Sequence, residues 1–452
     1  MKRAFLNGFT VNVASQIVTA ALQFISIPVY ISQWGAPAYG IWLLYFSLPA
    51  YLAVMDLGYS TAAGNDMTLA VAKQDYFAAR RTFQTSWIIT ATLSVLIGLI
   101  GAIVAFLISV NDFPQTVDVP GPTARAIFIL VLLYGLGAVQ MNMIIAAYRS
   151  AHLYARGVAL TMIVIALESS FSLALTLAGY GLLASAIAYT VIRWLSIPAC
   201  WAVLRLGAPW LSLFPFAGTK NELTRLLRPA LASLSLPFGF AVTLQGSIAA
   251  IGFSVLPAAV AAFSTVRVVT RTPFQLANAV SNAVMPEFTL AVGRSDIGRA
   301  QALFVLNATL LVCILVPGCL ALALVGVPLV RVWTNGHVDP PVELVLGLTL
   351  AAAFHASWLF VANLLLAVNR HRVYASAYPI VSIFGIVAVR IVAPLGLATV
   401  AIPLVAIELT MLLIVWWEFD KFMRIAWTEL WKGFFDLLAQ FRKAIWRERS
   451  NV

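Results

Sequence analysis

Charge is scarce in this 452-residue chain, because only 10% of its residues are Asp, Glu, Lys or Arg while 62% are hydrophobic. A soluble globular domain carries roughly 25% charged residues, so this chain cannot cover a globular surface of its own size. The composition excludes a soluble enzyme, a disordered chain and a disulfide scaffold. The apolar runs are far longer than the ~9–11-residue strands of a transmembrane barrel, so they predict an all-α integral membrane protein.

Cysteine and the signatures of soluble catalysis are also scarce. The three cysteines, Cys200, Cys313 and Cys319, lie inside apolar runs, and we expect them to be inert packing residues. The sequence has no Gly-rich loop ending in Gly-Lys-Ser/Thr, no His-Glu-x-x-His and no Gly-x-Ser-x-Gly. We therefore expect a protein without a metal site or cofactor, one that does not hydrolyse ATP itself and is not an enzyme.

Long hydrophobic runs are abundant, and a transmembrane helix needs ~20 mostly apolar residues. Twelve spans are predicted, over residues 9–30, 38–64, 83–110, 123–148, 158–178, 180–204, 230–253, 257–285, 299–325, 342–368, 373–392 and 395–417. The predicted parts are an N-terminal six-helix lobe over 1–204, a cytoplasmic linker over 205–229, a C-terminal six-helix lobe over 230–417 and a tail over 418–452. The spacing of apolar residues in the tail predicts an amphipathic helix, either on the anionic inner leaflet or packed against the bundle.

Basic residues fall mainly on one side of these spans. With a cytoplasmic N-terminus, 22 of the 28 Lys and Arg residues lie in inside segments. The positive-inside rule therefore predicts that both termini are cytoplasmic. The net charge of +11 then reflects topology, and it is no indication of nucleic-acid binding.

The two halves of the chain are weakly similar in order. For example, Ala91-Thr92-Leu93 matches Ala308-Thr309-Leu310, and Pro122 matches Pro341. Because each half has six helices, an even number, the chain enters the membrane from the same side at the start of both halves. This predicts a parallel repeat of the kind found in alternating-access transporters. We expect the substrate path between the two lobes.

Polar residues follow one face of the predicted helix over 257–285. They are Ser264, Arg267, Arg271, Gln275, Asn278 and Asn282. A central arginine costs about 2.5–3.5 kcal/mol in lipid, so this face must meet water, a carboxylate or an anionic ligand. A guanidinium also presents a planar fork suited to phosphate oxygens. The two alternatives are an anion-attracting cavity and an interhelical ion pair with Asp56, Glu168 or Glu408.

Other in-span polar residues are weaker candidates. A second polar face, on the helix over 9–30, predicts either a cavity wall or polar contacts between helices, and it comprises Asn12, Gln16, Thr19, Gln23 and Ser26. Arg193 is either a third cavity cation or a side chain that reaches an interface. Glu168 and Glu408 are either ion-coupling groups or partners of the arginines. Asp56 is a weaker coupling candidate that more readily anchors a helix end, and His355 is expected to be a hydrogen-bonded bundle residue.

Several short motifs carry a family resemblance. They are Ile27-Pro28-Val29-Tyr30, Gly35, Tyr39-Gly40-Ile41-Trp42, Asp56-Leu57-Gly58 with Asn65, and the 257–285 pattern that runs on to Met285-Pro286-Glu287. On these residues the chain resembles the polysaccharide-transport branch of the MATE/MurJ flippase superfamily, and most of all the Wzx-type O-antigen and exopolysaccharide flippases. The likeness covers residues 1–417.

The resemblance implies a V-shaped two-lobe fold with a central cationic cavity. It implies that the chain moves an undecaprenyl-pyrophosphate-linked oligosaccharide from the inner to the outer leaflet of a bacterial inner membrane, driven by H⁺ or Na⁺. Its partners would be that lipid-linked substrate, membrane lipids and polysaccharide polymerase or assembly proteins. Only Arg267 and Arg271 are carried over as cavity residues.

Three other functions compete with this interpretation. A MATE-like exporter of cationic drugs needs a cavity carboxylate, and the helices over 9–30 and 230–253 contain none. A membrane enzyme acting on lipid-linked sugars uses a sizeable outer loop, and the outer loops here are short. A non-transporting assembly subunit is the third alternative.

Overall fold

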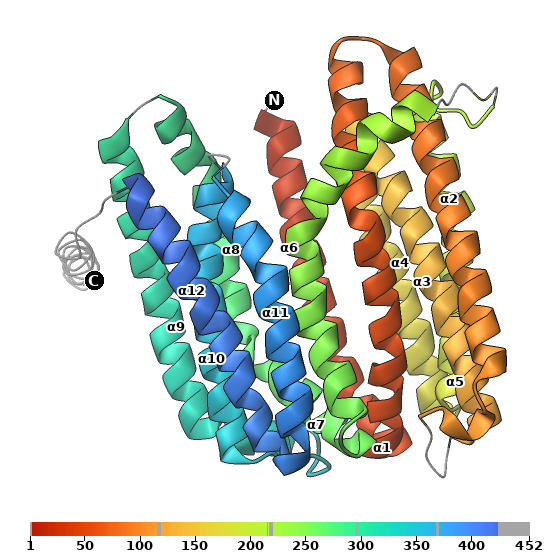
Figure 1. The fold of residues 1–452 in the computed structure, drawn as a ribbon, viewed down its shortest axis with the longest axis vertical. Helices are drawn as coiled ribbons and strands as arrows, with labels where there is room; N and C mark the ends of the chain where they lie inside the picture. The colour runs from red at the N-terminus through yellow and green to blue at the C-terminus, as the bar shows by residue number, and fades with distance from the viewer. Residues whose placement is uncertain are drawn as a thin grey trace, which may run out of the picture. The chain divides into compact units, whose positions relative to one another are not determined.

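The computed structural model describes residues 2–114, 119–214, 216, 220–294, 296–367 and 370–423, and within them the chain forms helices and no strand. The α-helices are α1 (Lys2–Ala72), α2 (Tyr76–Leu107), α3 (Gly121–Ser150), α4 (Tyr154–Leu177), α5 (Leu182–Gly207), α6 (Lys220–Gly252), α7 (Pro257–Thr270), α8 (Thr272–Gly293), α9 (Ile297–Trp333), α10 (Val342–Ala367), α11 (Arg372–Val392) and α12 (Ala401–Met423). Short 3₁₀ turns cover Val110–Asp112, Ala393–Leu395 and Leu397–Val400. Figure 1 shows these helices in chain order.

The helices match the predicted spans. Ten helical stretches in the described ranges are long and apolar enough to cross a membrane, so the chain is a multi-pass membrane protein and the all-α prediction is confirmed. The 71 residues of α1 hold the first two predicted spans, divided at Gly35. Gly35 has φ 78° and ψ 157°, a conformation that only glycine adopts readily, and it separates the two parts of α1.

The helix predicted over 257–285 is interrupted at Arg271, which separates α7 from α8. Pro273 explains the break. A proline has no backbone N–H, so Pro273 cannot close the helical hydrogen bond to the carbonyl of Val269, and its ring crowds the preceding turn. Arg271 therefore lies at a helix junction rather than in the middle of a regular helix.

The chain divides into two compact units. The first comprises Met1–Ala262 with Trp333–Val338, and the second comprises Phe263–Val332 with Asp339–Val452. In the first unit α6 runs along α1, as Figure 1 shows, so α6 groups with the helices that precede it. The division into lobes over 1–204 and 230–417 with a linker at 205–229 stays a prediction, although α6 already begins at Lys220.

The first unit has an apolar core between α1, α2, α3 and α5. Met67, Phe83 and Tyr148 are buried in it, and the Tyr148 hydroxyl donates a hydrogen bond of 2.7 Å to the carbonyl of Cys200. Cys200 and the two other cysteines are free thiols. In a membrane, where lipid is as apolar as these side chains, they stabilise the unit through close van der Waals packing between the helices.

A polar cluster joins α1, α2 and α6 at one end of the first unit. Arg225 donates two hydrogen bonds to the Asp66 carboxylate, at 2.7 and 2.6 Å, and the Thr82 hydroxyl donates a third at 2.8 Å. Burial raises the pKa of Asp66, but the hydrogen bonds from Arg225 and Thr82 outweigh it and hold the pKa below its ordinary value. The folded protein therefore favours the charged carboxylate.

We expect Arg225→Ala to reduce the free energy of unfolding by about 0.2–1 kcal/mol at neutral pH, a modest loss because the pair is partly exposed. A lowered folded pKa stabilises the protein above the unfolded pKa of about 3.9, and this contribution is lost as the pH falls through the folded value. The difference between wild type and variant should therefore vanish under acidic conditions, as measured by unfolding in mixed micelles from pH 7 to 3. Lys73→Ala, an exposed change nearby, is the control, and a pH-independent difference for Arg225→Ala would contradict the assignment.

In the second unit, α10 packs against α12 and α8, and α11 packs against α12. Trp358 on α10 and Tyr374 and Tyr378 on α11 are among the most completely buried large side chains. The centre of this unit is therefore built from α10, α11 and α12, with α8 packed against α10.

Candidate functional site

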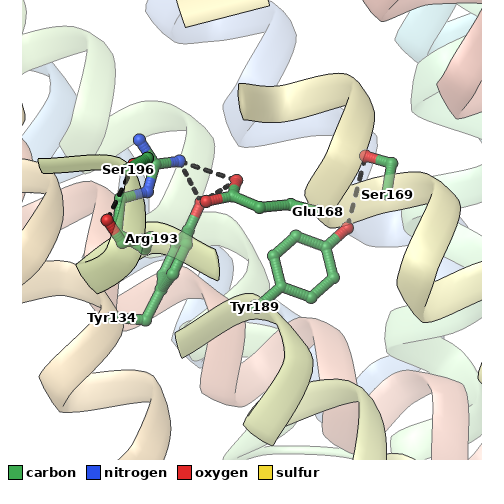
Figure 2. Close-up of polar contacts among 6 residues, drawn as sticks. All are labelled: Tyr134, Glu168, Ser169, Tyr189, Arg193 and Ser196. Carbon is green, nitrogen blue, oxygen red and sulfur yellow. Dashed lines mark hydrogen bonds and ion pairs between the residues drawn. The ribbon is translucent and has the colours of Figure 1, made fainter. Parts of the chain in front are cut away.

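A buried ion pair lies inside the first unit. Arg193 on α5 donates to Glu168 Oε2 on α4 at 2.7 Å, and the same Nη2 donates to the Tyr134 hydroxyl on α3 at 2.8 Å. Tyr134 in turn donates to Glu168 Oε2 at 3.3 Å. Figure 2 shows the three side chains converging from three helices. The side chains of Arg193 and Glu168 are only 8% and 1% exposed, so these contacts are made away from solvent.

Hydroxyl groups and an aromatic ring complete the surroundings of this pair. The guanidinium lies over the Tyr134 ring at 4.9 Å, and the Tyr189 and Ser169 hydroxyls are 3.5 Å apart beside Glu168, as Figure 2 shows. Glu168 Oε1 and Arg193 Nε are buried and have no hydrogen-bond partner among the described residues. The carboxylate therefore keeps one acceptor oxygen that can receive a further donor.

The ion pair accounts for the presence of Arg193 in an apolar span. A lone arginine at the bilayer centre costs about 2.5–3.5 kcal/mol, and a carboxylate partner with a tyrosine donor removes the need to face water. Of the two roles considered for Glu168, the structure shows the partnership with an arginine. Substrate binding by Arg193 stays a prediction, and its guanidinium is already engaged.

Arg267 and Arg271 lie near the α7–α8 junction, and both are half-buried. The Arg267 guanidinium lies 5.1 Å from the centre of the Phe263 ring, and that of Arg271 lies 5.1 Å from the centre of the Phe274 ring. The described residues contain no ion pair that involves Arg271. A guanidinium whose face rests on an aromatic ring keeps its N–H edge for a hydrogen-bond acceptor.

The predicted polar face continues along α8. Gln275 is exposed and Asn278 is half-buried, one and two turns beyond Arg271. The side chain of Asn282 lies outside the described residues. The described part of this face is therefore accessible at Gln275 and partly accessible at the two arginines, and its cavity role stays a prediction.

Glu408 on α12 is the buried carboxylate of the second unit. Its Oε2 atom lies 2.9 Å from Nδ1 of His355 and accepts a hydrogen bond of 2.6 Å from Nε1 of Trp358, both on α10. This confirms His355 as a hydrogen-bonded bundle residue. The role of Glu408 in ion coupling stays a prediction.

The predicted polar face of the first helix is only partly described. Gln16 and Gln23 are exposed, and the Thr19 hydroxyl bonds to the carbonyl of Ser15 at 2.8 Å on its own helix. The side chains of Asn12 and Asp56 lie outside the described residues, as does the tail from 424 onward. The role of this face as a cavity wall or as polar contacts between helices stays a prediction.

Sequence reasoning missed two residues of these clusters, Tyr134 and Trp358. Both are aromatic residues within apolar runs, so nothing in the periodicity distinguishes them from ordinary core residues. The usable signal is chemical, because a buried tyrosine or tryptophan needs a partner for its O–H or N–H.

Comparison with known proteins identifies the fold. No family model matches the sequence, and no curated protein matches it. Among solved structures, an inward-facing multidrug resistance MATE family transporter of the MOP superfamily superposes with a TM-score of 0.71, at 14% identity, over 91% of this chain and 96% of that one. The chain has the fold of the MATE transporters.

Two further structures agree. An outward-facing multidrug resistance MATE family transporter matches with a TM-score of 0.63, at 14% identity, over 95% of this chain and 97% of that one. A MOP superfamily transporter from Pyrococcus furiosus, described as having a binding pocket of reverse polarity that suggests a different function, matches with a TM-score of 0.62 at 14% identity. The match covers 94% of this chain and 96% of that one. At such identities the likeness establishes the fold alone.

Proposed function

We propose that this protein is a secondary transporter that moves an undecaprenyl-pyrophosphate-linked oligosaccharide from the inner to the outer leaflet of a bacterial inner membrane by ion-coupled alternating access. The observation that carries the proposal is the position of Arg271. It lies at a helix break within an apolar segment, half-buried, stacked on Phe274 and without an ion pair among the described residues.

Arg271 is suited to an anionic headgroup. Its guanidinium is permanently charged and presents several N–H donors in one plane, which matches the oxygens of a pyrophosphate. Arg267 lies one helical turn away and adds a second positive charge. Exposed Gln275 and half-buried Asn278 continue the same face and offer neutral hydrogen-bonding groups for sugars, while the lipid tail stays in the bilayer.

The fold supports transport without naming the cargo. Solved structures with this fold include inward-facing and outward-facing multidrug transporters, and one described as having a pocket of reverse polarity. The fold alone therefore does not fix the polarity of the binding pocket, and alternating access requires only that the cargo binds both facing states.

Export of cationic drugs is the second candidate function, and the same likeness favours it. The site chemistry opposes it, since a cationic drug needs an available carboxylate. Glu168 forms an ion pair with Arg193, and Glu408 is hydrogen-bonded to His355 and Trp358. Two arginines near the α7–α8 junction would also repel a cationic cargo.

The test is to replace the arginines in a host that depends on this chain for a surface polysaccharide. We expect Arg267→Ala and Arg271→Ala each to abolish the polymer while the protein still reaches the membrane, because each change removes a charge that holds the pyrophosphate. Polymer is measured by gel electrophoresis and the protein by immunoblotting of membranes. Arg390→Ala, an exposed arginine on α11, is the control and should leave the polymer unchanged.

The leaflet in which intermediates collect decides between functions. A deletion strain should accumulate lipid-linked repeat units that face the cytoplasm. Accumulation of outward-facing units would place the block after the flipping step. Normal polymer from the double arginine variant would remove the pyrophosphate role, and gain of resistance to cationic drugs on expression would favour the exporter.

A further inference from the structure

His355 and Glu408 form a buried acid–base pair in the second unit. The Nδ1 atom of His355 lies 2.9 Å from Glu408 Oε2, and the two side chains are 9% and 8% exposed. At this distance a proton lies between the two atoms, carried either by the imidazole or by the carboxyl group. Trp358 Nε1 can only donate, so it holds the same oxygen as an acceptor at 2.6 Å.

The pair can exist in two charge states that differ by one proton. With the carboxylate ionised and the imidazole neutral, it carries one negative charge. One further proton makes the pair neutral overall, whichever atom holds it, and no backbone movement is required. Because the two groups share a hydrogen bond, a proton taken up by either group changes the charge of both, so they form one coupled site rather than two independent ones.

The aromatic ring of Phe274 connects this pair to Arg271. The rings of Phe274 and His355 meet edge to face with centroids 5.0 Å apart, and the Arg271 guanidinium also lies against Phe274, 5.1 Å from the centre of its ring. The Glu408 carboxylate acts electrostatically on Arg271 across this short span. In a buried setting such an interaction is screened little.

Two other ionisable groups lie close to the pair, Tyr378 and Arg271. Tyr378 on α11 lies against Trp358 with ring centroids 5.1 Å apart, and it also acts electrostatically on Arg271. Arg271 itself comes from the α7–α8 junction. Of these groups, Arg271 is the permanently charged one, so its interaction with the pair changes when the pair gains or loses a proton.

We propose that His355 and Glu408 bind a single exchangeable proton and that this proton controls how strongly Arg271 binds a phosphate-type anion. The proposal deepens the proposed function and rests on it for the identity of the physiological anion. While the pair is negative, Glu408 competes with any anion for Arg271. Protonation removes this competition, so the proton and the anion bind cooperatively, and by linkage each strengthens the other.

The test uses purified full-length protein in lipid nanodiscs and inorganic pyrophosphate as the probe. Its affinity is measured by calorimetry from pH 5.5 to 8.5 for wild type and Glu408→Gln, which keeps the acceptor for Trp358 but not the charge. Since the pyrophosphate titrates identically in both experiments, the ratio of the two affinities cancels its own ionisation. We expect the affinity of Glu408→Gln divided by that of wild type to be near one at low pH. At high pH this ratio should rise to about ten, a typical coupling between interacting sites.

Matched variants show which contacts matter. Glu343→Gln removes an exposed carboxylate from the first turn of the same helix as His355. Its pyrophosphate affinity should equal that of wild type at every pH. His355→Gln keeps a hydrogen-bond donor for Glu408 but removes the imidazole. The pyrophosphate affinity of this variant should therefore change at a different pH from that of wild type. It also serves as the second variant if Glu408→Gln does not fold.

The outcomes separate this proposal from the proposed function. Equal affinities for wild type, Glu408→Gln and His355→Gln at every pH would overturn the proton site and leave the flippase proposal intact. Pyrophosphate binding that is unaffected by Arg271→Ala would overturn the link to Arg271. Absence of pyrophosphate binding at every pH would overturn both proposals.

Discussion

Glu168→Gln is expected to reduce the free energy of unfolding by about 3–5 kcal/mol, the usual loss when one partner of a buried ion pair is removed. The remaining Arg193 keeps its charge, because an arginine cannot release its proton in a protein. Its guanidinium would then be buried with only the Tyr134 hydroxyl and a neutral amide as partners. Unfolding by SDS titration in mixed micelles, followed by tryptophan fluorescence, measures the loss.

The reverse change provides the matched comparison. Arg193→Met should cost less than Glu168→Gln, because the isolated Glu168 carboxyl can take up a proton and so avoid a buried charge. The double variant should recover much of the loss, since it leaves no unpaired charge. Equal losses from the two single variants, or simple addition in the double variant, would contradict a buried ionised pair at this position.

Gly40→Ala is expected to destabilise the first unit by about 1–3 kcal/mol or more, the usual range for overpacking. A Cβ atom added at Gly40 would lie 1.8 Å from the carbonyl oxygen of Pro257, at the start of α7. The obstacle is backbone, which cannot rotate away as a flexible side chain can. The same micelle titration should show the loss, with reduced protein in the membrane fraction of cells.

Gly298→Ala is the control for this effect. Gly298 lies in the first turns of α9, and a Cβ there would meet no atom within 4 Å. Alanine favours a helix over glycine by up to about 1 kcal/mol, so this variant should be as stable as wild type or slightly more stable. Matching losses at Gly40 and Gly298 would contradict close packing as the cause.

The helices could be predicted from the sequence far better than the site. Each long apolar run became a helix because the bilayer leaves few other ways to pair backbone groups. Periodicity also identified Arg267 and Arg271 as sharing a face. It places Pro273 inside this helix, and a proline within a membrane helix is compatible with either a kinked or an interrupted helix.

The pairings within the site could not be predicted. Glu168 and Arg193 are 25 residues apart on successive helices, and His355 and Glu408 are 53 apart. Periodicity tells which face of a helix a residue occupies, but not which neighbouring helix meets that face or at what height. Thus the sequence left both carboxylates as either coupling groups or arginine partners, and only three-dimensional packing distinguishes Glu168, bonded to an arginine, from Glu408, bonded to a histidine.

The break between α7 and α8 has a consequence for hydration. Backbone hydrogen bonds resume on either side of it, from Arg271 N to the Arg267 carbonyl and from Gln275 N to the Arg271 carbonyl, but Pro273 has no N–H for the carbonyl of Val269. An unsatisfied carbonyl costs several kcal/mol in hydrocarbon, so acyl chains cannot line this stretch of the chain at low cost. The Val269 carbonyl must therefore find another donor, and where water supplies it, an ionic headgroup arriving beside Arg271 would exchange one hydrated surface for another.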